Sequence, residues 1–232
     1  MRLKSWAKLQ REKRDLPLTG WLSIFDHSAD VAACCEALLG NTLLSRRLAK
    51  LGGLTDLDLC HQQRLCVLAG YHDIGKFGHG FQNKQYEEPR FVAGHVREVL
   101  PFLAAKGGSL QAGFVEAIAF DELADWAKES DTVARLLVAS ICHHGKPQSV
   151  DEGEIQKSHW APAKEADPIA EIAELTAALK SWFPLAWTGN SWLPDQPEFE
   201  HAFSGLVMLA DWIGSDTSFF PLKEVNSAKS TS

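Results

Sequence analysis

The sequence lacks the features that would place it in a membrane or in a disulfide-rich class. None of its five cysteines forms a C-x-x-C pair. No apolar run approaches the roughly 18 residues of a membrane span, and the amino-terminal segment has no apolar core of a signal peptide. An odd cysteine count without such a signal is typical of reduced, buried thiols. We therefore expect a cytoplasmic protein without a membrane-spanning segment.

An excess of basic residues is also absent. The 232 residues carry a net charge of -7 at pH 7, which argues against a protein that coats nucleic acid but leaves room for a local positive groove. Positive charge does gather in residues 1–14, which contain six basic residues and one acidic residue. A solvated helix face is the plain alternative interpretation of that cluster.

Alternating strand patterns, internal repeats and a recognisable linker are missing too. Apolar residues instead recur at helical spacing, first after Asp26 or Ser28 and again after Asp56 or Asp58, each a residue that can cap a helix. Further helices are expected from about 93 and over 110–127, 132–142, 168–182 and 199–214. Irregular segments are expected at 77–90, 150–167 and 183–197. The sequence therefore predicts an all-α fold, one compact multi-helix domain over residues 1–221, with a disordered tail at 222–232.

The stretch 68–77 carries the strongest chemical signal. It places His72 beside Asp73, followed by Gly75 and Lys76. Neighbouring side chains on a regular helix diverge by about 100°, so the end of a helix suits a chelating pair better. Gly75 as the residue after the helix would put His72 and Asp73 in its last turn. Lys76 would then emerge beside a metal, where a phosphate can meet it.

The same stretch contains the spacing of a P-loop. Gly70 to Lys76 reads G-x-x-x-x-G-K, which in a P-loop is followed by a Ser or Thr that holds magnesium. This chain has Phe77 there, and it carries His72 and Asp73 inside the loop. We therefore interpret the stretch as metal-binding rather than nucleotide-binding.

Other side chains that can bind metals also fall at predicted helix ends. His27 and His95 lie in the first turns of their helices, the adjacent pair 143–144 precedes Gly145, and Asp211 lies near the end of the last strong helix. The candidate metal ligands are His27, His72, Asp73, His95, His143, His144 and Asp211.

Seven ligands exceed one tetrahedral site and suit two divalent metal ions, with Asp73 bridging them. Two such cations hold a phosphate and a water, lower the pKa of that water and neutralise charge on the phosphorus. The histidine content favours Mn, Fe, Co or Ni over Mg, because Mg prefers oxygen ligands. Mg remains an alternative.

Each candidate has a structural alternative. An isolated histidine such as His27 or His95 is more often a hydrogen-bonded core or surface residue. Asp211 among apolar neighbours is either a buried ligand or a capped polar group, and Lys76 is otherwise a surface lysine. Long gaps between ligands cannot be validated by spacing. Four further histidines show no such placement and are interpreted as structural or surface residues: His61, His79, His159 and His201.

Six short motifs follow one another along nearly the whole chain. They are Trp6-Ala7-Lys8, Asp26-His27-Ser28, residues 72–77 with Phe81-Gln82, Gly94-His95, His143-His144-Gly145, and residues 210–216. In this order they resemble the HD phosphohydrolase superfamily, and more narrowly the HD nuclease domain of the type I CRISPR-associated nuclease-helicase. The His-Asp pair is shared by all HD hydrolases, whereas the double histidine and the Ala-Asp-Trp-x-Gly-Ser ending narrow the match.

The resemblance implies an all-helical domain whose metal site cuts single-stranded DNA in type I CRISPR interference, an antiviral defence. By matching position, one metal would be held by His27, His72, Asp73 and Asp211. The second would be held by Asp73, His95, His143 and His144. Lys76 would contact the scissile phosphate or stabilise the transition state. Ser215, four residues after Asp211, is a weaker candidate for a phosphate contact if the helix continues.

The resemblance also implies partners. The family works with a crRNA-guided surveillance complex, which presents the displaced DNA strand. No helicase motor is expected in this chain, because its only G-x-x-x-x-G-K is the spacing that begins at Gly70. A helicase would act in cis if the chain is part of a longer protein, or in trans. Alone, the chain would nick single-stranded DNA locally, as an endonuclease or an exonuclease.

Two rival functions remain open at this point. A small-molecule HD phosphohydrolase acting on nucleotides or cyclic dinucleotides would use the same metal chemistry in a closed, base-specific pocket. A non-catalytic binding module could keep the helical core, but seven candidate ligands argue against it because a binding role needs no such set.

Overall fold

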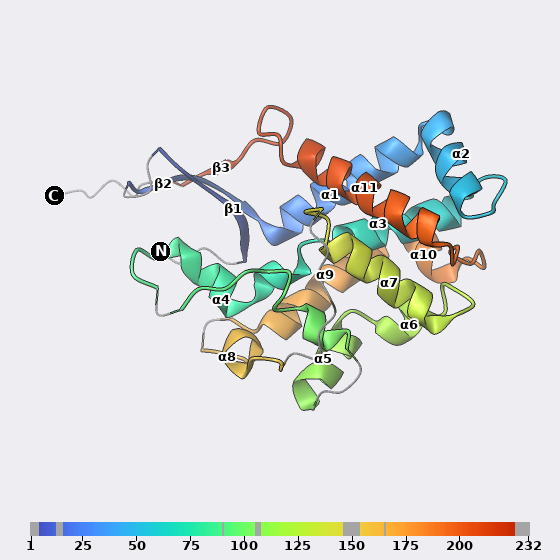
Figure 1. The fold of residues 1–232 in the computed structure, drawn as a ribbon. Helices are drawn as coiled ribbons and strands as arrows, with labels where there is room; N and C mark the ends of the chain where they lie inside the picture. Colours follow the sequence, from blue (N-terminus) through green and yellow to red (C-terminus); the bar gives the residue numbers. More distant parts are fainter. Residues whose placement is uncertain are drawn as a thin grey trace.

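Helices make up most of the chain, and a small antiparallel sheet lies at one end (Figure 1). The structure is a computed structural model, and it describes residues 5–12, 16–89, 91–104, 108–145, 154–164 and 166–225. The prediction of a helical fold is confirmed, but the sheet was not expected. None of the described helices combines the length and the apolar composition that a membrane crossing requires.

The described elements follow a single order along the chain. The longer helices are α1 (Ile24–Leu39), α2 (Thr42–Leu51), α3 (Leu59–Gly70), α5 (Ser109–Ala117), α7 (Ser130–Ile141), α9 (Pro168–Trp182) and α11 (Pro197–Gly214). The short helices are α4 (His79–Gln82), α6 (Phe120–Ala124), α8 (Lys157–Trp160) and α10 (Pro184–Thr188). The 3-10 turns are η1 (Ile74–Phe77), η2 (Asn83–Gln85) and η3 (Leu100–Phe102), and the strands are β1 (Trp6–Arg11), β2 (Leu18–Ser23) and β3 (Lys223–Glu224).

Helix α3 runs through the centre of the core. It contacts α1, α7, α9, α10 and α11, and its last six residues, 65–70, are buried on all sides. A helix that is apolar all round belongs in a protein interior. Gly70 allows the closest approach, because a Cβ there would lie 2.5 Å from Leu179 Cδ2. Helices α1 and α11 pack against each other and against α3, so the ends of these three helices have fixed relative positions.

The helix starts agree only in part with the expected caps. Of the two expected caps, Asp56 and Asp58, it is Asp58 that caps α3, by accepting a hydrogen bond from the backbone N–H of His61. Helix α1 begins earlier than expected, because Ser23 rather than Asp26 or Ser28 is its cap. His27 is therefore the fourth residue of α1 and still lies in its first turn.

The sheet corrects two expectations. Strand β1 occupies residues 6–11 of the basic cluster, so this part of the cluster is not a helix face, and residues 1–4 and 13–14 lie outside the described residues. Strand β3 pairs with β2, so the disorder expected at 222–232 does not include residues 223–224, whereas residues 226–232 lie outside the described part. A bulge in β1 at Ala7 and the brevity of each strand hide the two-residue period that would have marked the sheet in the sequence.

Other differences have local causes. The helix expected from about 93 is only the 3-10 turn η3, in which Pro101 removes a backbone donor. The helix expected at 110–127 is split into α5 and α6, because Ala119 adopts a left-handed conformation with a φ of 53°. The irregular segments expected at 77–90 and 183–197 contain the short helices α4 and α10, and the described part of 150–167 contains α8.

Candidate metal centre

His72 and Asp73 occupy the turn between α3 and η1. Helix α3 ends at Gly70 and the 3-10 turn begins at Ile74, so the expectation that the pair lies in the last turn of a helix is wrong. Backbone hydrogen bonds of the i to i+3 type, such as that from Lys76 N to Asp73 O at 2.8 Å, replace the helical pattern here. This tight turn brings two adjacent side chains to one side of the backbone.

Gly75 does not act as the expected helix cap. A Cβ at this position would lie 1.6 Å from the carbonyl oxygen of His95, so no side chain fits between the two backbones. The glycine therefore allows the segment that carries His95 to lie directly against η1. It places a third candidate ligand beside the His72-Asp73 turn.

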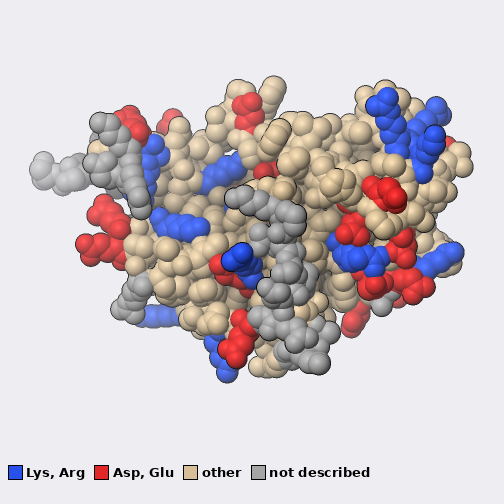
Figure 2. Space-filling view, in the orientation of Figure 1, with Lys and Arg blue, Asp and Glu red and all other residues tan. Residues whose placement is uncertain are grey.

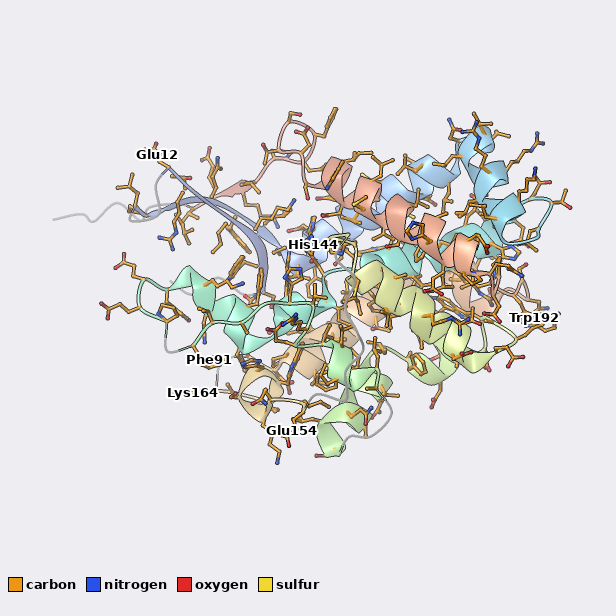
Figure 3. All side chains as sticks on the ribbon, in the orientation of Figure 1. Glu12, Phe91, His144, Glu154, Lys164 and Trp192 are labelled. Carbon is orange, nitrogen blue, oxygen red and sulfur yellow. The ribbon has the colours of Figure 1, made fainter. Side chains whose placement is uncertain are left out.

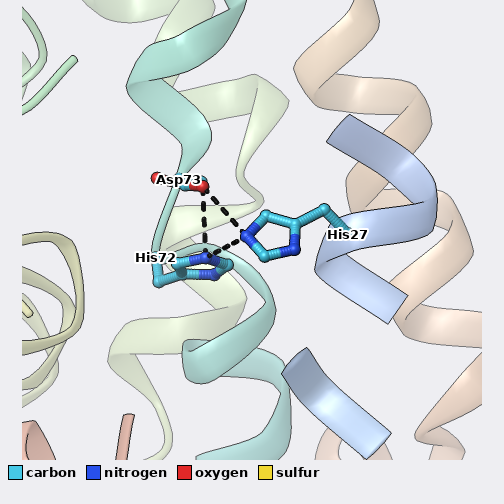
Figure 4. Close-up of side chains that lie close together, drawn as sticks. All are labelled: His27, His72 and Asp73. Atoms are coloured by element: carbon cyan, nitrogen blue, oxygen red, sulfur yellow. Dashed lines mark hydrogen bonds and ion pairs between the residues drawn. The ribbon is translucent and has the colours of Figure 1, made fainter. Parts of the chain in front are cut away.

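Three buried side chains meet at the end of α3 (Figure 4). Asp73 Oδ2 lies 3.3 Å from both His27 Nε2 and His72 Nε2, and the two imidazole nitrogens are also 3.3 Å apart. These three ligand atoms lie within 4.8 Å of one another, close enough to share one metal ion. Asp211 of α11 completes this side, because its Oδ1 is 3.1 Å from His27 Nε2.

The remaining histidines approach from the other side of Asp73. His95 Nε2 lies 3.4 Å from Asp73 Oδ1 and 3.0 Å from His144 Nε2. His143 lies between the two sides, since its Nε2 is 3.6 Å from Asp211 Oδ2 and its ring centroid is 4.9 Å from that of His72. The structure thus brings all seven candidate ligands into one cluster, from the ends of α1, α3, α7 and α11 and from the segment before η3.

Two of the imidazoles are oriented by the helices that precede them. His72 Nδ1 lies 2.9 Å from the carbonyl oxygen of Ala69, and His143 Nδ1 lies 3.0 Å from that of Ser140. Carbonyls in the last turn of a helix have no donor four residues later, and in each case the carbonyl three residues earlier accepts from both the backbone N–H and the ring N–H of the histidine. Nδ1 therefore carries the proton, and the Nε2 lone pair faces the cluster as a metal ligand requires.

The burial of Asp73 is not compensated by hydrogen bonds. Its side chain is 1 % exposed, and within the described chain neither carboxylate oxygen has a well-aligned donor. Lys76 Nζ lies 2.5 Å from Oδ2, but one cation leaves the other oxygen without a partner. Nδ1 of His27 is likewise buried without a partner among the described residues. An ionised carboxylate in such a place is costly unless a cation binds it, so the donor set fits a divalent metal.

Protonation states in the cluster suit metal binding. Burial alone would raise the pKa of Asp73, but the charges of Lys76 and His72 outweigh it and hold that pKa well below its ordinary value. Burial lowers the pKa of His95 to about 3 and that of His143 to about 4. At neutral pH the carboxylate is therefore ionised and these imidazoles are neutral, which are the forms that bind metal.

Lys76 and Ser215 have defined partners. The Lys76 ammonium pairs with Asp73 and donates to the carbonyl oxygen of Ala7 at 3.4 Å, so it lies at the metal cluster as its position in the motif predicts. Helix α11 ends at Gly214, and Ser215 follows as its cap. The Ser215 hydroxyl donates to Asp211 Oδ1 at 2.9 Å. Ser215 therefore orients a candidate ligand, and its contact with a phosphate stays a prediction.

Sequence reasoning assigned no role to Gln82, which is buried beside Lys76. Its side-chain oxygen accepts from the backbone of Trp6 at 3.1 Å, and its amide donates to the carbonyls of Trp6 and Lys76 at 2.9 and 2.7 Å. This one side chain ties β1 to η1. The only signal in the sequence was its position in the motif that follows Phe77.

The histidines interpreted as structural are outside the cluster. His61 lies between Asp58 Oδ1 and the carbonyl of Trp192, at 2.9 and 3.0 Å. His79 contacts the carbonyl of Ala161 at 2.9 Å. His159 stacks on Phe91 with a centroid distance of 5.2 Å, and His201 is exposed on α11.

Comparisons with solved structures show the same fold in proteins of low sequence identity. A crystal structure of a CRISPR-associated protein matches with a TM-score of 0.65 and 22% identity over 97% of this chain and 24% of that chain. The Thermus thermophilus Cas3 HD domain, solved in the presence of Ni2+, matches with a TM-score of 0.56 and 22% identity over 86% of this chain and 74% of that chain. A chain of a CRISPR RNA-guided surveillance complex in a pre-nicking state matches with a TM-score of 0.50 and 22% identity, over 94% of this chain and 25% of that chain.

The protein thus spans about a quarter of the longer chains that it matches. No curated protein sequence shows significant similarity to it. The family model described as the HD domain of Cas3 matches residues 6–220, a range that includes every candidate ligand. The chain therefore belongs to the Cas3 HD-domain family of CRISPR-associated, metal-dependent HD nucleases.

Proposed function

We propose that this protein hydrolyses phosphodiester bonds in single-stranded DNA as the nuclease of type I CRISPR interference. The observation that carries the proposal is the gathering of six further ligand side chains around the buried carboxylate of Asp73, which has no hydrogen bond among the described residues. Membership of the Cas3 HD family supplies the reaction class. A binding module would have no use for a buried, ionised carboxylate without hydrogen bonds, because that group costs stability.

Two divalent metal ions are the proposed cofactors, with Mn, Fe, Ni or Co favoured over Mg because most ligands are imidazoles. The Thermus thermophilus domain was solved in the presence of Ni2+, which supports this choice. The proposed ligands of one ion are His27, His72, Asp73 and Asp211, and those of the other are Asp73, His95, His143 and His144. When bound, such ions activate water and neutralise the charge that develops on phosphorus.

Contacts within the protein hold the proposed ligands and Lys76 in position for metal and phosphate. Asp73 offers one oxygen toward His27 and His72 and the other toward His95, which is the arrangement of a bridging carboxylate. The carbonyls of Ala69 and Ser140 fix two rings before any metal arrives. Lys76 is held by the Ala7 carbonyl with its positive charge at the rim, where it can stabilise a phosphate in the transition state.

The direction in which the cluster opens supports a polymeric substrate. His27, His72 and Asp73 are fully buried, whereas the side chains of Asp211 and His95 are 16% and 17% exposed and His144 is exposed. Because solvent reaches Asp211, His95 and His144, we infer that one phosphate of a strand can approach these ligands while the strand continues on both sides. We therefore favour single-stranded DNA over a nucleotide or cyclic dinucleotide that must enter a closed pocket.

Partners follow from the same proposal. A chain of similar fold belongs to a CRISPR RNA-guided surveillance complex, and we propose that such a complex presents the DNA strand to this protein. Since the longer matched chains extend well beyond this one, a helicase acts with it in cis or in trans. Five free cysteines, four of them buried, agree with a cytoplasmic location.

The test is incubation of the purified protein with circular single-stranded DNA in Mn2+, Ni2+, Mg2+ or chelator. We expect linear products with a transition metal and intact circles with chelator, which would also identify an endonuclease. Parallel reactions with deoxynucleoside triphosphates serve as the control for a small-molecule phosphohydrolase. Intact DNA with every metal, or faster hydrolysis of the triphosphates, would contradict the proposal.

A further inference from the structure

Strand β1 approaches the metal cluster through a bulge. Trp6 pairs with Ser23 and Lys8 pairs with Leu22, so Ala7 is an extra residue without a partner on β2. A bulge leaves its extra residue unpaired and re-aims the neighbouring side chains. The carbonyl of Ala7 is the one that accepts from the Lys76 ammonium. Lys8 therefore directly follows the residue whose carbonyl contacts Lys76 of the cluster.

The backbone of β1 is fixed on both sides of the bulge. Ser5 has a left-handed φ of 48°, and its carbonyl accepts from the backbone of Ile24 at 2.7 Å, which attaches the strand to the start of α1. On the other side, Gln82 bonds both backbone groups of Trp6, and the Trp6 ring packs on Phe81 at a centroid distance of 4.6 Å. The backbone that carries Lys8 is therefore held in place by Ser5 and Trp6.

Lys8 lies in the electrostatic field of the cluster. Its ammonium is influenced by the charges of Asp211, Asp73 and Lys76, and by that of Asp30 on α1. Burial is the largest influence and lowers the pKa of Lys8, which is half-buried. Within the described part of the chain, however, no carboxylate lies at ion-pair distance from this ammonium.

The neighbouring lysines differ from Lys8 because each has a partner. Lys76 pairs with Asp73 at 2.5 Å, and Lys223 pairs with Asp26 at 2.5 Å. Lys84 lies over the Phe81 ring with its nitrogen 4.3 Å from the centroid. Among the described residues, Lys8 and Lys84 thus have no carboxylate at ion-pair distance, and of these two only Lys84 contacts an aromatic ring.

Metal ions at Asp73 and Asp211 would cancel two of the negative charges that act on Lys8, while the charge of Lys76, which contacts the neighbouring residue Ala7, would remain. A phosphate oxygen suits two such ammonium groups. We propose that Lys8 is a second phosphate-binding residue, which contacts the strand at the phosphodiester next to the one that Lys76 faces. This inference rests on the proposed nuclease function, because it assigns that substrate a second contact.

The surface offers a matched control. Lys50 is exposed at the end of α2, and α2 lies at the opposite end of the molecule from β1 (Figure 1). Lys and Arg side chains are visible in Figure 2 both over the sheet end and over α2, with mostly uncharged surface between them. Lys50→Gln therefore removes the same charge from the protein without touching the sheet end.

The experiment measures binding of a phosphorothioate oligothymidine, whose linkages resist hydrolysis, to the Mn2+-loaded protein over a series of salt concentrations. We expect Lys8→Gln to weaken binding about fivefold and to reduce the slope of log affinity against log salt by about 0.7, the value for one lost contact on a single strand. Lys50→Gln should match the wild type, and Lys8→Arg should restore binding. In cleavage assays Lys8→Gln should raise KM more than it lowers kcat.

The outcomes separate the two claims. Wild-type affinity and salt slope in Lys8→Gln would overturn this inference and leave the nuclease intact. Loss of bound Mn2+ in Lys8→Gln would also overturn it, since Lys8 would then support the ligands rather than the strand. A wild-type protein that binds the oligothymidine through Lys8 but cleaves no DNA would instead contradict the nuclease function. Failure of the wild type to bind would contradict both.

Discussion

Two buried charges lie along the course of α3: Arg64 within the helix and Asp73 just beyond its end. They differ in the hydrogen bonds that compensate for their burial. In the N-terminal half of the helix, Arg64 is 3% exposed and donates to the carbonyls of Ala186, Gly189, Ser191 and Trp126. Beyond its C-terminus, Asp73 is 1% exposed and has no well-aligned donor among the described residues. Figure 3 labels a neighbour of each site: His144 of the metal cluster lies near the middle of the view, and Trp192, in the loop that Arg64 holds, lies at its right-hand edge.

This difference indicates a structural role for Arg64 and a functional role for Asp73. Arg64 fastens the loop 189–192 and the Trp126 ring, which it faces at 5.3 Å, and its hydrogen bonds compensate for its burial. A hollow of about 340 Å³ remains beside it, lined by Trp126, Trp187 and Trp192 among others. The carboxylate of Asp73 has an ion pair with Lys76 but no hydrogen bond among the described residues, as expected where selection acts on activity rather than on stability. The comparison can be tested at both ends.

The largest effect is expected from Asp73→Ala. We expect cleavage of single-stranded DNA to fall by at least about a thousandfold, since one substitution removes the ligand shared by both metals. The metal-free variant should lose some stability, because the Lys76 ammonium loses its partner, but less than a variant of Arg64, whose loss leaves four carbonyls without that donor. Cleavage rate and thermal unfolding in chelator measure the two effects. Near wild-type cleavage, or a melting temperature as low as that of an Arg64 variant, would contradict the contrast between the two sites.

Arg64→Met should show the reverse pattern. The variant leaves buried carbonyls without donors, and we expect the free energy of unfolding to fall by about 3 kcal/mol. Activity per folded, metal-loaded molecule should stay near that of the wild type. Urea unfolding and the rate per bound metal measure these quantities, with Arg46→Met on the exposed surface of α2 as the control. Unchanged stability would show that Arg64 is not the structural anchor.

Acid should affect the metal end first. The pKa values of His95 and His143 are lowered to about 3 and about 4 in the folded protein, below the value of about 6.5 in the unfolded chain. The folded state therefore binds fewer protons, and its stability falls as the pH decreases from about 6.5 toward those lowered values. Urea midpoints of the metal-free protein at several pH values test this, and His143→Asn should flatten the dependence. A rise in stability toward acid would contradict the sign.

The smallest effect is expected from Ser215→Ala. Its hydroxyl bonds Asp211, so its loss should weaken metal affinity by about tenfold, as for other groups that orient ligands. Saturating metal should then restore most of the rate. If Ser215 contacts the phosphate instead, the variant will keep its metal affinity and show a raised KM. Metal titration and steady-state kinetics distinguish the two roles.

Helix ends were the part of the site that the sequence could predict. Apolar periodicity and the glycine breaks located the ends of α7 and α11 to within two residues, and they placed His27 in the first turn of α1 although that helix begins earlier than expected. The pairing of His72 with Asp73 was predictable, but its turn was not, because Gly75 serves a close approach to His95 that only the folded chain reveals.

Tertiary contacts explain what the sequence missed. Two adjacent buried residues at the β1 bulge, Trp6 and Ala7, interrupt the alternation that identifies a strand. Gln82 gave no signal beyond its place in the motif, since its side chain bonds Trp6, which is 76 positions away, as well as Lys76. The start of α1 was misplaced because Ser23, Asp26 and Ser28 are all competent caps within six residues, and the sheet decides among them.

The most direct test of the account is anomalous diffraction from crystals grown with Mn2+. The account predicts two manganese peaks about 3.5–4 Å apart, with Asp73 between them and Asp211, His95 and the 143–144 pair around them. Manganese bound elsewhere, with Asp73 still free of any metal at full occupancy, would contradict it.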